Sequence, residues 1–69
     1  MLNSSLIKQI RLDRGLTQEQ VAFELGIAQS LVCVLEYNPN HNVTIKLLEK
    51  MSKFYQLPIS SLIKPNPEL

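Results

Sequence analysis

The sequence predicts an all-α domain of five short helices, and three observations support this fold class. Apolar residues recur at helical spacing through most of the chain, turn-forming residues separate these stretches, and no alternating apolar–polar stretch long enough for a strand occurs. The chain has 69 residues, of which 45% are hydrophobic and 19% charged, as is ordinary for a folded domain. We therefore expect one domain over residues 1–69, with its core at about 4–63 and a flexible tail at 64–69.

The composition limits the classes of protein that come into question. No apolar run approaches the roughly 20 residues that cross a bilayer, and the first residues lack the layout of a secretion signal. The single Cys33 cannot form an internal disulfide and fits a reducing compartment. We therefore expect a cytoplasmic protein with no membrane partner. The net charge of +1 is far below that of a non-specific nucleic-acid binder, so composition alone names no ligand.

Two helices are expected in the first third of the chain. The first covers about residues 4–14, capped by Ser4 or Ser5 and ended by Gly15, which can adopt a left-handed conformation. The second has the clearest signal, because residues 17–20 form a capping box in which threonine and glutamine satisfy each other's backbone amides. Gly26 ends this helix.

The third helix, at about residues 28–37, follows after only a few residues, so it must cross the second at a steep angle. Turn formers occupy residues 38–42, and Asn38 is expected to adopt a left-handed conformation. Thr44 caps the fourth helix, and a last short helix covers about residues 60–63, after the break at Pro58. The fourth helix is expected to turn these residues inward: Ile45, Leu48, Met51, Ser52 and Tyr55.

In this order, the helices and their residues resemble the phage repressor/Cro-like helix-turn-helix family over about residues 6–63. The residues that carry the resemblance are Arg11, Gly15 to Gln18, Val21, Ala22, Leu25 to Ile27, Val32 and Glu36. Residues 42–46 are also similar to the controller proteins of restriction–modification systems, a branch of this family. The resemblance implies a compact five-helix repressor-like domain, with a helix-turn-helix formed by the second and third helices. It further implies a transcriptional regulator that binds double-stranded DNA as a homodimer, on a pseudo-palindromic operator.

The resemblance also assigns DNA contacts to particular residues. Thr17 and Gln18, at the start of the second helix, would meet a phosphate, and Gln18 would also brace the third helix. Gln29 and Ser30 would read bases from the major groove, although a solvated first turn would have the same sequence. The loop after the third helix would pass the DNA backbone through Tyr37 and Asn40, in company with Asn38 and His41.

The middle of the third helix is more apolar than the family leads one to expect. Leu31 and Val34 are predicted to be exposed, where they would press on thymine methyl groups or form a protein-binding patch. The second possibility gives the alternative function, an antirepressor or antitoxin that binds another protein. Cys33 is expected to be a small buried residue beneath this helix.

One further pair of residues is expected to be structural. Arg11 and Glu36 resemble the family's internal ion pair, which links the first helix to the end of the third. The exposed row of Lys46, Lys50 and Lys53 is typical of a solvated helix face. The resemblance places a dimer interface near the C-terminus, and its expected residues are Phe54, Ile59, Leu62 and Ile63.

An enzyme is not expected, because no set of residues suggests a nucleophile with its base and acid. The single His41 has no second histidine or cysteine near it in the sequence, so we expect no metal. We also expect no cofactor and no small-molecule ligand. Regulation would then depend on protein concentration, dimerisation or a regulatory protein partner.

Overall fold

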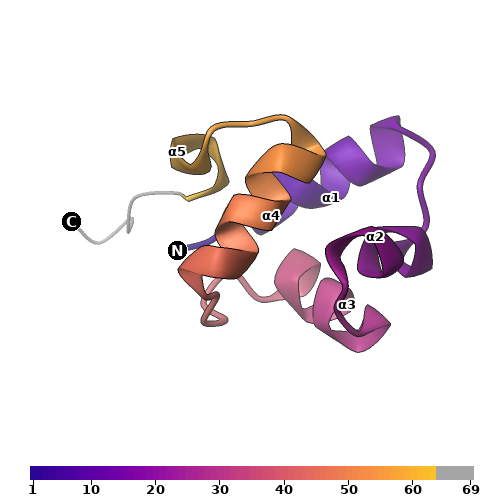
Figure 1. The fold of residues 1–69 in the computed structure, drawn as a ribbon, viewed down its shortest axis with the longest axis horizontal. Helices are drawn as coiled ribbons and strands as arrows, with labels where there is room; N and C mark the ends of the chain where they lie inside the picture. The colour runs from indigo at the N-terminus through magenta and orange to yellow at the C-terminus, as the bar shows by residue number, and fades with distance from the viewer. Residues whose placement is uncertain (64–69) are drawn as a thin grey trace.

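The computed structural model describes residues 1–63, and the tail predicted at 64–69 lies outside the described residues. The described part of the chain forms five helices, as expected, and α2 and α3 are joined by a short turn (Figure 1). Its β-structure is a single isolated antiparallel bridge between Leu2 and Ile63. The helices are α1 (Ser4–Asp13), α2 (Gln18–Leu25), α3 (Gln29–Tyr37), α4 (Ile45–Tyr55) and α5 (Ile59–Leu62).

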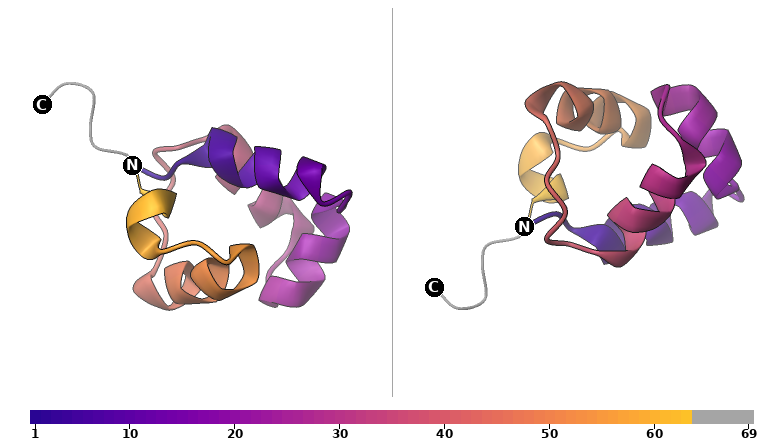
Figure 2. Two further views of the ribbon diagram at one scale, coloured as in Figure 1. Left: turned by 90° about the horizontal axis from the view of Figure 1, so that it is seen from above. Right: turned by 90° about the horizontal axis from the view of Figure 1, so that it is seen from below.

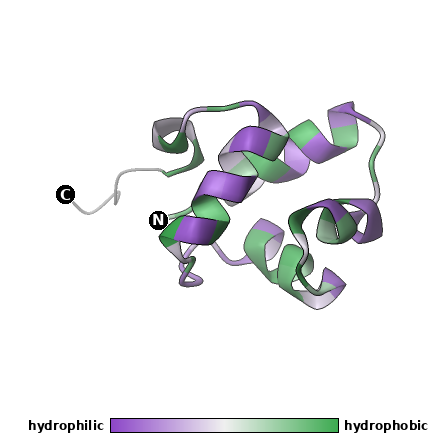
Figure 3. Ribbon diagram, viewed as in Figure 1, coloured by the Kyte–Doolittle hydropathy of each residue, from purple (hydrophilic) through white to green (hydrophobic). Residues whose placement is uncertain are grey.

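The five helices surround one core, with α1 and α4 on opposite sides of it (Figure 2). Each helix contributes at least one side chain that is at most 2% exposed: Ile7, Val21, Leu35, Met51 and Leu62. On α4, hydrophilic residues occupy the outer side (Figure 3). The core also includes Leu2, which lies before the start that we expected at about residue 4, because Leu2 forms an antiparallel bridge with Ile63 at the other end of the fold.

The helix ends follow the sequence in some places and depart from it in others. The capping box of α2 is confirmed, since the Thr17 hydroxyl accepts the Gln20 amide at 3.1 Å and the Gln20 side chain accepts the Thr17 amide at 2.7 Å. Gly26 ends α2 with φ +68°, and Thr44 caps α4, both as predicted. The N-cap of α1 is Asn3, so the expectation of Ser4 or Ser5 was wrong.

Two expectations for the second half of the chain were also wrong. Asn38 has φ −114°, in the extended region, because the chain leaves α3 directly toward Pro39. Within residues 1–63, the non-glycine residue with a left-handed backbone is Gln56, at the end of α4, with φ 59°. Ile45 was expected to face inward, but it is 73% exposed, because it lies in the first turn of α4 at the edge of the core.

Along the described residues, no helix is long and apolar enough to span a bilayer.

Candidate nucleic-acid interface

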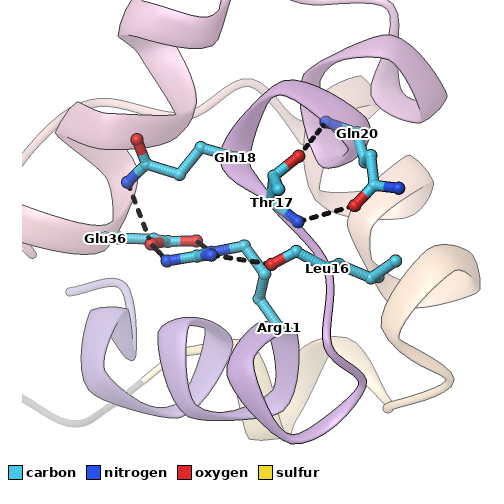
Figure 4. Close-up of polar contacts among 6 residues, drawn as sticks. All are labelled: Arg11, Leu16, Thr17, Gln18, Gln20 and Glu36. Atoms are coloured by element: carbon cyan, nitrogen blue, oxygen red, sulfur yellow. Dashed lines mark hydrogen bonds and ion pairs between the residues drawn. The ribbon is translucent and has the colours of Figure 1, made fainter.

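The end of α3 is fixed to α1 by a nearly enclosed ion pair (Figure 4). Arg11 Nε donates to Glu36 Oε2 at 2.8 Å and Nη2 donates to Oε1 at 3.0 Å, which makes the contact bidentate. The two side chains are 10% and 3% exposed. The third guanidinium nitrogen, Nη1, donates to the Leu16 carbonyl at 2.8 Å. The pair expected from the sequence is therefore present and also holds the α1–α2 connection.

Glu36 has a further partner, since Gln18 Nε2 donates to its Oε1 at 3.2 Å (Figure 4). The hydrogen bond to the Glu36 carboxylate raises the pKa of the Arg11 guanidinium, which favours its charged form. Three helices thus meet at one carboxylate. Gln18 braces α3, as expected, and its second amide hydrogen is not used by this bond.

The C-terminal end of α3 is held by this ion pair, and the outer side of the helix exposes a polar stripe. Gln29 and Ser30, in its first turn, are exposed, as are Cys33 one turn later and Tyr37 at its end. Tyr37 is 86% exposed. Cys33 was expected to be buried, and that expectation was wrong. The core stripe of α3 is Val32, Leu35 and Glu36, and Cys33 lies about 100° around the helix from Val32.

Leu31 and Val34 were expected to be exposed, and both are half-buried. Leu31 and Cys33 flank the buried stripe of α3 on opposite sides. Leu31 packs against the hydrophobic core, which explains why it is covered and Cys33 is not. The apolar surface that the sequence suggested on α3 is therefore smaller than expected.

The remaining candidate contacts lie at both ends of the helix-turn-helix. Thr17 is exposed, but its hydroxyl already caps α2. Asn40 is exposed in the loop after α3, where its amide donates to Asn38 Oδ1 at 3.0 Å. Of the candidate contacts, Gln18 lies on α2, Asn40 lies in the loop after α3, and three lie on α3 itself: Gln29, Ser30 and Tyr37.

One of the four expected dimer residues is enclosed in its own chain. Leu62 has no exposed area and belongs to the core of its own chain, so its assignment to a dimer interface was wrong. Phe54 and Ile59 are half-buried, and the Phe54 ring lies 5.1 Å from the Tyr55 ring at 76°. Ile63 is 42% exposed and is the most accessible residue of this set.

Sequence reasoning missed the part played by Arg14. Its guanidinium donates to the Phe54 carbonyl at 2.9 Å and to the Tyr55 carbonyl at 2.7 Å, so it satisfies the C-terminal end of α4. Basic residues that follow a predicted helix end are candidates for such contacts, but a carbonyl partner 40 residues away leaves no signal in the sequence. The Lys46, Lys50 and Lys53 row is exposed, as expected of a solvated face.

These features define a helix-turn-helix domain. A short turn that contains a glycine joins α2 to α3, and α3 has an exposed polar stripe and a C-terminal end held by the Arg11–Glu36 pair. A family model described as helix-turn-helix matches residues 7–62. The chain therefore belongs to the Cro/C1-type helix-turn-helix family.

Two curated relatives bear names of regulators. The chain is 33% identical over 60 residues to the cryptic phage CTXphi transcriptional repressor RstR of Vibrio cholerae, covering 87% of this chain and 53% of the relative. It is 31% identical over 62 residues to the HTH-type transcriptional regulator SinR of Bacillus licheniformis, covering 90% and 56%. The chain thus spans a little over half the length of each of these relatives.

Solved structures of SinR share the fold. The structure of SinR in complex with DNA matches with a TM-score of 0.74 and 30% identity, covering 86% of this chain and 94% of that one. The SinR–SinI complex matches with a TM-score of 0.78 and 29% identity, covering 99% and 65%.

Proposed function

We propose that this protein is a sequence-specific DNA-binding transcriptional repressor, and not an enzyme. The observation that carries the proposal is the exposed stripe of Gln29, Ser30, Cys33 and Tyr37 on a helix whose rear is fixed by the Arg11–Glu36 pair. Family membership supports it, as do the regulator names of the relatives and the solved DNA complex of SinR. Such a function would place the protein in the cytoplasm, with DNA.

In this proposal, α3 enters the major groove with its N-terminal end. Gln29 can form two hydrogen bonds with adenine, donating one to N7 and accepting one from the N6 amino group. Ser30 can form a hydrogen bond with either base of a pair. The Cys33 thiol is small enough to lie against a base edge one turn further on. Gln18, through its unused amide hydrogen, would donate to a backbone phosphate, with Thr17, Tyr37 and Asn40 beside the same strands.

We further propose that the protein binds as a homodimer to a pseudo-palindromic operator, with the two α3 helices roughly 34 Å apart. A single module with a net charge of +1 has little electrostatic attraction for DNA, so a second copy adds the affinity that charge does not supply. Because Leu62 is part of the core, the pairing surface would be built around Ile63 and Ile59 instead.

The proposal is tested by fluorescence anisotropy with a duplex from the gene's own upstream region and a scrambled duplex of equal composition. We expect preference for the native duplex at moderate salt, and affinity that falls steeply as salt rises. Gln29→Ala should cost about 1–3 kcal/mol and relax specificity at one base pair, whereas Lys53→Gln, the control, should leave specificity unchanged. Equal affinity for both duplexes would refute sequence-specific binding.

The alternative function, binding of another protein through Leu31 and Val34, gives a different result in the same assay. An apolar interface loses little affinity as salt rises, and a protein of that kind would not discriminate between duplexes. The half-burial of both side chains leaves this alternative with less surface than the sequence suggested.

A further inference from the structure

The helix-turn-helix lies in a stretch of sequence that contains no basic side chain. Between Arg14 and Lys46 the sequence has neither lysine nor arginine, and this interval includes all of α2 and α3. Lysine and arginine make the commonest specific contacts to guanine, because they donate to its O6 and N7 atoms. The helix that is proposed to enter the major groove therefore has no side chain of the kind that most often reads guanine.

The two arginines that precede this stretch are held by contacts within the chain. Arg11 is 8% exposed, and its guanidinium donates to Glu36 and to the Leu16 carbonyl. Arg14 donates through Nη1 and Nη2 to two carbonyls at the end of α4. Both guanidinium groups are therefore engaged by the fold and do not add a cation to α3.

The other way to read a G·C pair is also closed on α3. A free carboxylate can accept a hydrogen bond from the N4 amino group of cytosine. The carboxylate of α3 belongs to Glu36, which is 8% exposed. Both of its oxygens accept hydrogen bonds from Arg11, and Oε1 also accepts one from Gln18. On α3, then, neither a cation faces guanine nor a free carboxylate faces cytosine.

The side chains that α3 does expose in its first half suit an A·T pair. Gln29 offers an amide donor and a carbonyl acceptor, which complement the N7 acceptor and the N6 donor of adenine. Against guanine, the Gln29 carbonyl oxygen would face O6, a second acceptor, and would stay unpaired. Cys33 is exposed, and a thiol behaves as a small apolar group that fits the methyl group of thymine. Ser30 bonds to any base and adds no preference.

The spacing of these residues sets the length of the sequence that they read. Gln29 and Cys33 lie one turn apart on the same side of α3. Four residues advance an α-helix by about 6 Å and base pairs are stacked about 3.4 Å apart, so the two side chains address pairs about two steps apart. With Ser30 between them, the first half of α3 covers about three consecutive base pairs.

We propose that the part of the operator beneath the first half of α3 consists of A·T pairs, with adenine opposite Gln29 and a thymine methyl group against Cys33. Guanine and cytosine are excluded from these positions and not from the flanking ones. The inference rests on the proposed function, because it gives the base composition of the DNA that the same surface reads.

The test is repeated selection of duplexes from a randomised library by the full chain, followed by sequencing. The pairs beneath α3 are those that Gln29→Ala and Cys33→Ser relax, and we expect all of them to be A·T. If no sequence is enriched, the proposed function fails, and the inference fails with it. If sequences are enriched and the relaxed pairs are G·C, the inference is wrong and the proposed function stands.

Base analogues in the selected duplex test the two contacts one at a time. The first is 7-deazaadenine, which lacks the N7 acceptor, at the pair that Gln29→Ala relaxes. The second is deoxyuridine, which lacks the methyl group, at the pair that Cys33→Ser relaxes. Loss of one hydrogen bond should weaken binding about 2- to 12-fold, and loss of the methyl contact about four-fold. Each variant should be insensitive to its own analogue, and equal losses for variant and unchanged protein would overturn the inference.

A substitution that supplies the missing cation gives the converse result. Gln29→Arg should change the selected base at one position from adenine to guanine. Lys50→Gln is the critical control, since Lys50 Nζ lies 3.9 Å from the place that a Cβ on Gly26 would take, beside the α2–α3 turn. We expect Lys50→Gln and Lys53→Gln to leave the selected sequence unchanged. A change with Lys50→Gln would show that a lysine reads one of these pairs, and would contradict the proposal.

Discussion

Replacing Glu36 with alanine would leave the Arg11 guanidinium enclosed without its counter-ion. Arg11 would lose the acceptors of Nε and Nη2 and keep only the Leu16 carbonyl. Since the two side chains are 10% and 3% exposed, solvent cannot replace the lost carboxylate. Breaking a buried pair in this way costs about 3–5 kcal/mol. In a domain of this size, that loss lowers the Tm by at least about 12 °C.

The assay is urea denaturation followed by helical circular dichroism, with Glu36→Gln and the double change Arg11→Met/Glu36→Leu beside Glu36→Ala. The glutamine variant should lose less, because its amide oxygen still accepts one hydrogen bond from Arg11. The double change should recover most of the stability, since an apolar pair of similar volume replaces a desolvated ion pair. A cost below about 1 kcal/mol for Glu36→Ala, the value of an exposed pair, would refute the buried-pair reasoning.

Three further predictions concern stability. Burial, together with the Glu36 carboxylate, raises the pKa of Tyr55 to about 12. Between pH 10 and 12 the unfolded state ionises more than the folded state, so stability should fall across that range by about 2 kcal/mol, and Tyr55→Phe should flatten the fall in urea titrations at each pH. Arg14→Gln should cost about 1–2 kcal/mol in thermal unfolding, because carbonyls at the end of α4 lose their donors, whereas the exposed control Lys53→Gln should cost almost nothing. Leu62→Ala should cost about 2–5 kcal/mol and Ile63→Ala below about 1, and equal costs would contradict the placement of Leu62 in the core.

Local chemistry made the two ends of α2 predictable. The capping box at Thr17 and the glycine at residue 26 act within a few residues of themselves, so nothing distant can override them. The Arg11–Glu36 pair was also found, although 25 residues separate its members, because the resemblance supplied a contact that periodicity alone cannot.

The failures concern positions whose environment is set by distant elements. In the nine-residue helix α3, apolar side chains lie on both sides of the buried stripe, and the sequence does not say which side packs against the core. Leu31 is covered and Cys33 is not, because the neighbouring helices lie on one side only. Leu62 was assigned to a dimer surface because the resemblance places one near the C-terminus, but α5 packs against α1 and α4, which buries Leu62.

The bridge between Leu2 and Ile63 has a consequence for engineering. Asn3 N–H donates to the Leu62 carbonyl at 2.6 Å, and Leu2 N–H donates to the Pro39 carbonyl at 2.9 Å. Residues opposed in an antiparallel bridge lie only about 5 Å apart. A linker of a few residues would therefore close this part of the chain into a ring without moving a helix, and new ends could be opened at the exposed Gly15.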